Sequence, residues 1–173
     1  MRRDPYDDLP AVSSFHLESS LIATGETLPV AQRSGIFGAG GEDTSPDLAW
    51  SGFPAETQSF IATMYDPDAP TPSGFWHWAA INVPAAVTSL PAGAGDGDET
   101  LPDGATHLTN DGGSRRYLGA APPPGDPHRY FVVITALDIA DAGLPDTTSP
   151  ALALFQTLPH AVARARLVPE YGV

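Results

Sequence analysis

Glycine and proline interrupt this sequence along its whole length. Of the 173 residues, 17 are glycine and 19 are proline. Proline breaks helices, and both residues favour turns, so short strands and loops are expected. Hydrophobic residues make up 42% of the chain, which is enough for one core in a chain of this length. We therefore predict a single all-β domain over residues 1–173, with residues 1–12 as a flexible lead-in.

Charge and residue usage exclude several classes of function. The formal net charge is −13, from 21 acidic and 8 basic residues, which would repel nucleic acid and anionic lipid surfaces. There is no lysine for a Schiff base and no cysteine for a thiolate or a disulfide. No apolar run approaches the roughly 18 residues of a membrane span, and no signal-peptide pattern opens the chain. We expect a cytoplasmic protein without nucleic-acid partners or stable membrane insertion.

Three segments carry clear strand patterns. Residues 59–65 and 77–83 are rich in apolar and aromatic residues, and the second is apolar enough to predict a central strand buried on both faces. Residues 129–137 give the strongest pattern, while residues 15–17 and 21–23 resemble short strand pieces. Residues 91–127, dominated by Gly, Asp and Pro, predict a long irregular excursion of a kind that is often functional.

Helix signals are confined to the end of the chain. Ser149 is a suitable N-cap, Pro150 suits the first helical position, and an apolar stripe follows at residues 152, 154, 155 and 158. Pro159 should break or kink this helix before residues 161–165.

Three polar clusters lie at predicted strand ends. Residues 66–70 have the sequence DPDAP, which places the carboxylates of Asp66 and Asp68 in a turn after a strand. His77 stands between two tryptophans at the start of the buried strand. Residues 122–130 have the sequence PPPGDPHRY, a stiff proline loop that leads into His128 and Tyr130. Taken singly, each cluster has a purely structural explanation as a turn, a core histidine or a rigid loop.

Together, two imidazoles, a phenol and a pair of carboxylates predict a compact anion site. The His and Tyr side chains would donate hydrogen bonds to phosphate or carboxylate oxygens, and an Asp would fix the tautomer of a His and favour its protonated form. Such a site binds better at lower pH. It needs no basic patch, because the donors act locally in a partly dry pocket.

The motifs resemble those of the phosphatidylethanolamine-binding protein family. The resemblance rests on YDPDAP at residues 65–70, FWHW at residues 75–78 and a proline loop ending in HRY at residues 128–130. It is closest to the bacterial Raf-kinase-inhibitor-like branch, whose members carry patterns similar to GEDTSPDLAWSG at residues 41–52. It extends from about residue 34 to residue 171.

The resemblance implies a large central sheet packed on a smaller one, with a ligand pocket near one edge and a C-terminal helix beside it. It also implies a pocket for phosphate, phosphoethanolamine or a carboxylate. The residues that would line this pocket are Asp66, His77, Pro122, Pro123, His128 and Tyr130. Asp68 would support them. Family members are described as inhibitors of kinases or proteases and as binders of phospholipid head groups. A protein partner and a homodimer are therefore also implied.

Two positions depart from the family pattern. Where the family often has GxGPP, residues 119–123 have the sequence GAAPP, which changes how closely backbone amides can approach a phosphate. Pro159 and His160 stand where many bacterial relatives have Gly-His.

The residues leave three alternatives to an anion-binding protein. Asp66 could orient His77 or His128 as a general base toward an ester or phosphoester. The same three side chains could instead hold zinc, and all of the clusters could serve stability alone. Standard motifs for nucleophilic, nucleotide and zinc-protease chemistry are absent from the sequence. We therefore expect a binding protein and not an enzyme, with no metal and no cofactor.

Overall fold

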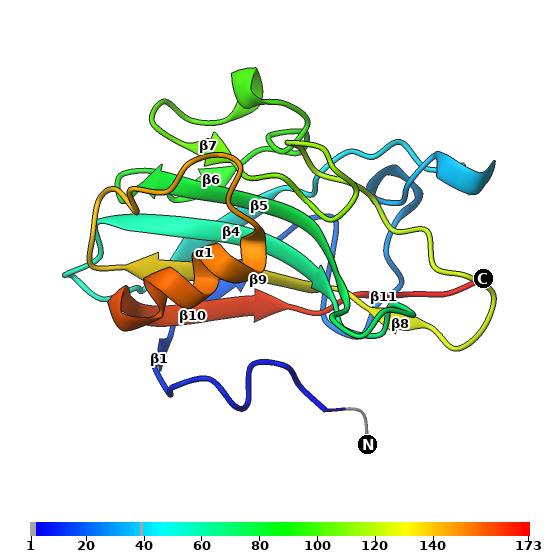
Figure 1. Ribbon diagram of the computed structural model, residues 1–173, viewed down its shortest axis with the longest axis horizontal. Coiled ribbons are helices and arrows are strands. Elements are labelled where there is room, and N and C mark those ends of the chain that lie inside the picture. Colours follow the sequence, from blue (N-terminus) through cyan, green and yellow to red (C-terminus); the bar gives the residue numbers. More distant parts are fainter. Residues whose placement is uncertain (1–2, 39) are drawn as a thin grey trace.

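A six-stranded sheet forms the centre of the molecule in a computed structural model that describes residues 3–38 and 40–173 (Figure 1). Its strands, in spatial order, are β1 (Ser13–Ser14), β10 (Ala161–Leu167), β9 (Phe131–Leu137), β4 (Ser59–Asp66), β5 (Phe75–Pro84) and β7 (Thr106–His107). All neighbouring strands are antiparallel except β1 and β10, which are parallel. The three segments with clear strand patterns are confirmed as β4, β5 and the pair β8–β9.

Two smaller sheets complete the β structure. One contains β2 (His16–Glu18), β3 (Leu48–Ser51) and β6 (Ser89–Leu90), and the other pairs β8 (His128–Arg129) with β11 (Glu170–Tyr171). Four single 3-10 turns lie in the loops, namely η1 (Val30–Gln32), η2 (Ile36–Gly38), η3 (Asp98–Thr100) and η4 (Leu158–His160). The all-β prediction is confirmed.

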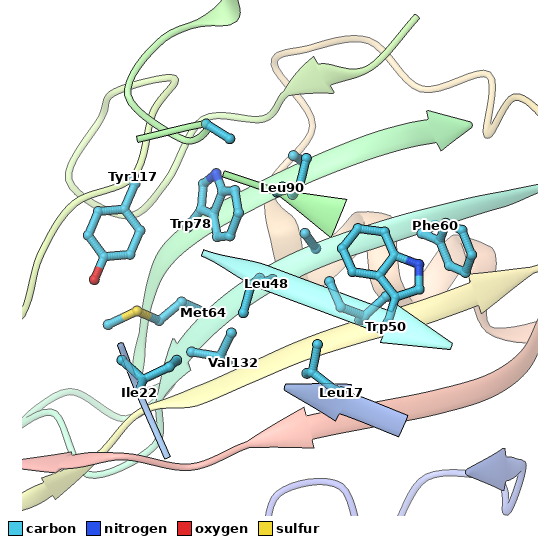
Figure 2. Close-up of a cluster of buried hydrophobic side chains, with 14 of the residues drawn as sticks. Leu17, Ile22, Leu48, Trp50, Phe60, Met64, Trp78, Leu90, Tyr117 and Val132 are labelled. Atoms are coloured by element: carbon cyan, nitrogen blue, oxygen red, sulfur yellow. The ribbon is translucent and has the colours of Figure 1, made fainter. Parts of the chain in front are cut away.

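The main core lies between the central sheet and the sheet of β2, β3 and β6 (Figure 2). Along β9, residues 132, 134 and 136 enter this core, because successive side chains of a strand point to opposite faces. Trp50 from β3 meets Phe60 from β4 edge to face, with ring centroids 5.3 Å apart. Trp78 and Tyr117 close the other side of the core, also edge to face, at 6.0 Å.

The outer face of the central sheet is covered by helix α1 (Pro150–Thr157) and by residues 3–10. Ser149 caps the helix as predicted, since its hydroxyl accepts a hydrogen bond from the Leu152 amide at 3.2 Å. The helix packs on a second apolar cluster that includes Ile61, Ile81 and Leu137. Tyr6 lies on Phe131 further along the same face, with ring centroids 5.9 Å apart.

The predicted break of the helix at Pro159 is confirmed, and residues 161–167 then form strand β10, an element that the sequence analysis did not predict. Helix α1 ends at Thr157, and the turn η4 around Pro159 redirects the chain. From Ala163 onward the strand alternates, with Ala163 and Ala165 in the core and Arg164 and Arg166 on the outer face. This period of two is a strand signal, but the small side chains make it easy to miss. Residues 21–23 are also not a strand.

A β-bulge in β5 determines where His77 points. Met64 of β4 pairs with Trp78, and the next residue, Tyr65, pairs with Trp76, so His77 is an extra residue without a partner on β4. Trp76 lies on the outer face, whereas His77 and Trp78 both lie on the inner side. Strict alternation would have placed both tryptophans on one face of the sheet and His77 on the other. Bulges of this kind re-aim side chains near functional sites.

Candidate anion-binding site

A cavity of about 700 Å³ opens where β4 ends and β5 and β8 begin. Most of its wall is apolar, and its polar side chains come from the predicted clusters. The lining residues are Ile36, Phe37, Gly38, Asp66, Ala69, Pro70, Thr71, Phe75, His77, Leu118, Gly119, Ala121, Pro122, Pro123, Pro124, His128, Tyr130, Tyr171 and Val173. An apolar cavity with a few convergent polar groups is the usual form of a small-molecule site.

Asp66 and His128 form a buried pair in this cavity. The Asp66 carboxylate accepts a hydrogen bond from His128 Nδ1 at 2.7 Å through Oδ2, and from the Asp68 amide at 2.8 Å through Oδ1. Both side chains are nearly inaccessible to solvent. Because the Nδ1 atom of His128 is bonded to Asp66, its Nε2 atom is the ring nitrogen that remains for a ligand.

His77 is oriented by a backbone carbonyl. Its Nδ1 donates to the Leu118 carbonyl oxygen at 2.9 Å, which can only accept, so Nδ1 carries a proton and Nε2 is the nitrogen left for a ligand. Burial lowers the pKa of His77, and the nearby charge of Asp66 only partly opposes this effect. The neutral ring offers a lone pair at Nε2, and the protonated ring offers a donor.

Tyr130 supplies a buried hydroxyl to the cavity. Its side chain is fully buried, and within the described ranges no group accepts from or donates to its Oη. Burial, reinforced by the charge of Asp66, raises the pKa of Tyr130 far above its usual value, so the phenol keeps its proton. Its ring lies edge-on to His77, with centroids 5.5 Å apart. Buried polar atoms are nearly always hydrogen-bonded, and an unpaired one calls for a ligand or a water molecule.

Asp68 does not line the cavity. Its carboxylate forms a two-pronged ion pair with Arg129, at 2.8 Å to Nε and 2.9 Å to Nη2, and also accepts from the Arg129 amide at 3.0 Å. This clamp fixes strand β8 and therefore the neighbouring residues His128 and Tyr130. Pro122 and Pro123, in contrast, lie on the cavity wall. The structure thus brings together six of the seven predicted site residues and places Asp68 behind them.

The family model described as "Phosphatidylethanolamine-binding protein" matches residues 18–172. The chain belongs to the phosphatidylethanolamine-binding protein family. It is 43% identical to the UPF0098 protein YbcL and 42% identical to the UPF0098 protein YbhB, both of Escherichia coli (strain K12). These matches cover 93% and 90% of this chain, and 89% and 99% of the respective relatives.

Solved structures agree with the family membership. The crystal structure of E. coli YbcL, described as a new member of the mammalian PEBP family, superposes with a TM-score of 0.88 and covers 93% of this chain and 99% of YbcL. The putative phosphatidylethanolamine-binding protein homologue CT736 of Chlamydia trachomatis superposes with a TM-score of 0.75 at 25% identity, covering 93% of this chain and 99% of CT736. The expected fold, a large sheet packed on a smaller one, is therefore shown by the chain itself and by its relatives.

Asp43 supports the cavity wall and was missed as a site residue, although it lies in the family-like segment 41–52. Its carboxylate accepts hydrogen bonds from the Gly119 amide at 2.8 Å and the Gly35 amide at 3.1 Å. Burial alone would raise the pKa of Asp43, but these hydrogen bonds lower it. Gly119 lies so close to the Arg33 backbone that a Cβ atom would not fit. The start of the loop that departs from the family pattern is therefore held in place by Asp43 and by the backbone of Arg33.

One lining residue, Tyr171, carried no sequence signal. Tyr171 reaches the cavity because β11 pairs with β8, a contact between segments about forty residues apart that no local pattern predicts. Phe75 contacts His77, with ring centroids 4.8 Å apart. His160 lies elsewhere: it pairs with Asp138 at 2.9 Å, near the opposite end of the sheet.

The described residues contain no group of three or more His, Cys, Asp or Glu side chains that could hold a metal ion. In the same part of the chain, no helix is long and apolar enough to cross a lipid bilayer.

Proposed function

We propose that the cavity binds a small anion, the phosphate or carboxylate head group of a larger molecule, and performs no chemistry on it. The observation that carries this proposal is the buried Tyr130 hydroxyl, which keeps its proton and has no hydrogen-bond partner among residues 3–38 and 40–173. It lines the same cavity as the imidazoles of His77 and His128. One donor and two rings that can become donors suit an oxyanion. The apolar wall suits the remainder of the ligand, as in phosphoethanolamine derivatives.

Binding should be linked to protonation of the histidines. Each ring already uses Nδ1 in the protein, so Nε2 can donate to an anion only after the ring gains a proton. Burial keeps the pKa of His77 low in the free protein, and an anion at Nε2 would raise it. Affinity is therefore highest at acid pH and falls as pH rises through the pKa of His77 in the complex.

Calorimetric titration with acetate, phosphate and phosphoethanolamine at about pH 6 and pH 8, either side of the reference His pKa, tests the proposal. Acetate stays ionised at both values, so a change in its affinity must come from the protein. We expect saturable binding that weakens at pH 8 and is lost in His128→Ala. Absence of binding at both pH values, or equal binding by the variant, would disprove the proposal.

The Asp66–His128 pair also supports a second candidate, hydrolysis of an ester or phosphoester. An imidazole oriented by a carboxylate at 2.7 Å can act as a general base on a water molecule. Turnover of a model phosphomonoester and a model ester by the purified protein tests this candidate. Turnover that is lost in both His128→Ala and Asp66→Asn would support it, and turnover that survives in these variants would point to a contaminating enzyme.

The family resemblance further suggests that the occupied cavity modulates a protein partner such as a kinase or protease. The exposed side chains of Ile36, Phe37 and Val173 at the cavity mouth are suited to such a contact. The partner, the homodimer and the cytoplasmic location remain predictions.

A further inference from the structure

A second cavity, of about 280 Å³, lies on the outer face of the central sheet. Residues 3–10 form one wall, helix α1 forms another, and strands β4, β5, β9 and β10 form the floor. The lining is mostly apolar and comprises Pro5, Tyr6, Leu9, Tyr65, Trp76, Thr135, Ala151, Leu154, Phe155, Thr157, Leu158, Ala161 and Arg164.

The two cavities lie on opposite faces of the same strand pair. Tyr65 and Trp76 line the second cavity, and the residues that follow them, Asp66 and His77, line the first. The Tyr65 and Trp76 rings stack at the end of the second cavity, with centroids 4.3 Å apart. The second cavity is therefore separate from the anion site described above, and it contains a tryptophan that can report on occupancy.

Arg164 is the one cation in the lining of the second cavity. It projects from β10 and donates to the Pro10 carbonyl at 3.1 Å, and it forms no ion pair with any carboxylate in residues 3–38 and 40–173. Its strand neighbour Arg166, in contrast, pairs with Asp4 at 2.6 Å. The Arg164 side chain is half-buried, and this burial lowers the pKa of its guanidinium.

A half-buried guanidinium without an acid is unusual in a chain with 21 acidic residues. Arginine has five N–H donors, and the carbonyl of Pro10 uses only one of its two terminal nitrogens. The remaining donors match the geometry of a carboxylate, which arginine binds through two parallel hydrogen bonds. Tyr6 and Thr135, which both carry a hydroxyl, are also among the lining residues.

We propose that the second cavity binds a single-chain amphiphile with a carboxylate head group, in which Arg164 holds the carboxylate and the alkyl chain lies against helix α1. The cavity is at the small end of the range for ligand sites, which fits a medium-chain acid better than a two-chain lipid. Its apolar wall of Ala151, Leu154 and Leu158 provides the surface for the chain.

Titration of the full chain with decanoate, below its micelle concentration, tests this proposal. Binding is followed by calorimetry and by the fluorescence of Trp76, with decanol as the uncharged comparison. We expect one saturable site, an affinity for decanoate at least tenfold lower in Arg164→Gln, and loss of binding in Ala151→Phe, which fills the cavity from an exposed helix position. Arg166→Gln removes the same charge from the same strand outside the cavity and should bind normally.

The anion site provides the control for location. His128→Ala should keep decanoate binding, and saturating phosphate should not displace decanoate from the wild type. Decanoate binding that is lost in His128→Ala but intact in Arg164→Gln would assign the ligand to the first cavity and overturn the proposal. Equal affinity for decanol and decanoate, or no binding at all, would also overturn it.

Discussion

Tyr117 and Tyr130 are both fully buried, but only one of their hydroxyls has a partner. The Tyr117 hydroxyl donates to the Gln32 carbonyl at 2.7 Å, whereas the Tyr130 hydroxyl has no partner among the described residues. A buried hydrogen bond stabilises the fold, and an unpaired buried hydroxyl does the opposite. Matched substitutions of the two residues can therefore distinguish a tyrosine that stabilises the fold from one that binds a ligand.

Tyr130→Phe should weaken acetate or phosphate binding by about 1.5–3 kcal/mol, the usual contribution of a hydrogen bond to a charged group. The free energy of unfolding should stay the same or rise, because the variant removes an unpaired polar atom. Tyr117→Phe should lower the free energy of unfolding by about 1–3 kcal/mol, because the Gln32 carbonyl loses its donor, and should leave binding intact. Calorimetry and urea denaturation measure both effects, and the reverse pattern would contradict the assignment.

His107 should make stability depend on pH. Its ring is completely buried, with Nδ1 3.1 Å from Asp98 and Nε2 without a partner in the described part of the chain. Burial lowers the pKa of His107, and the effect of Asp98 only partly offsets this. The unfolded chain therefore takes up a proton near pH 6.5 while the folded chain resists it.

The free energy of unfolding should consequently be highest above about pH 6.5 and fall as pH drops below that value. Burial lowers the pKa of His77 too, so this histidine adds to the same trend. His107→Gln should give a shallower slope between about pH 7 and pH 5 in urea denaturation. A slope as steep as that of the wild type would show that other groups cause the loss.

At the level of single residues, the sequence indicated which side chains line the first cavity, because strand ends and turns are marked locally. Asp66 and His128 could be named from their motifs, yet the 2.7 Å contact between them joins residues far apart in the chain. The family resemblance gave Asp68 a supporting role, but its partner Arg129 could not be inferred, because it lies on strand β8, far from Asp68 in the sequence. Tyr171 carried no signal, since its place depends on the pairing of β11 with β8.

The ion pair between Asp68 and Arg129 should stabilise strand β8. Asp68→Asn keeps an acceptor for the Arg129 amide but removes the charge, so the free energy of unfolding should fall by about 1–3 kcal/mol. Anion affinity should change less than in Asp66→Asn, where the carboxylate that orients His128 is itself altered. Denaturation and acetate titration compare the two variants. Equal losses of affinity would mean that Asp68 acts on the ligand directly.

Among the elements, long apolar strands and the capped helix were predictable, and short elements were not. β4, β5 and β9 carry continuous apolar patterns, and α1 has Ser149 and Pro150 at its start. β10 was missed because its inward side chains are alanines and its outward ones include arginines. The bulge in β5 had no signal, because its position depends on the register with β4.

The whole molecule carries a net charge of −13, and this charge opposes its compact state. Added salt screens such repulsion, so the free energy of unfolding should rise by roughly 0.5–1 kcal/mol between low and physiological ionic strength. Glu42→Gln, Glu56→Gln and Asp103→Asn together remove three exposed negative charges and should reduce that gain. Urea denaturation at two NaCl concentrations measures it. An unchanged gain in the triple variant would show that the effect is not one of net charge.

The strand pair β4–β5 acts as a common wall between two cavities. Residues that line one cavity are adjacent in sequence to residues that line the other, such as Trp76 beside His77. Decanoate in the cavity on the outer face of the sheet and phosphate in the cavity on its inner face would be separated by one layer of backbone.

The extra residue in β5 has an evolutionary consequence. Because His77 reaches the first cavity through a bulge, the number of residues between Phe75 and Trp78 matters as much as their chemistry. Deleting one residue there would leave a plausible strand and an intact core, but no imidazole in the cavity. Loss of a single codon at this point would therefore remove His77 from the cavity even if every other lining side chain stayed the same.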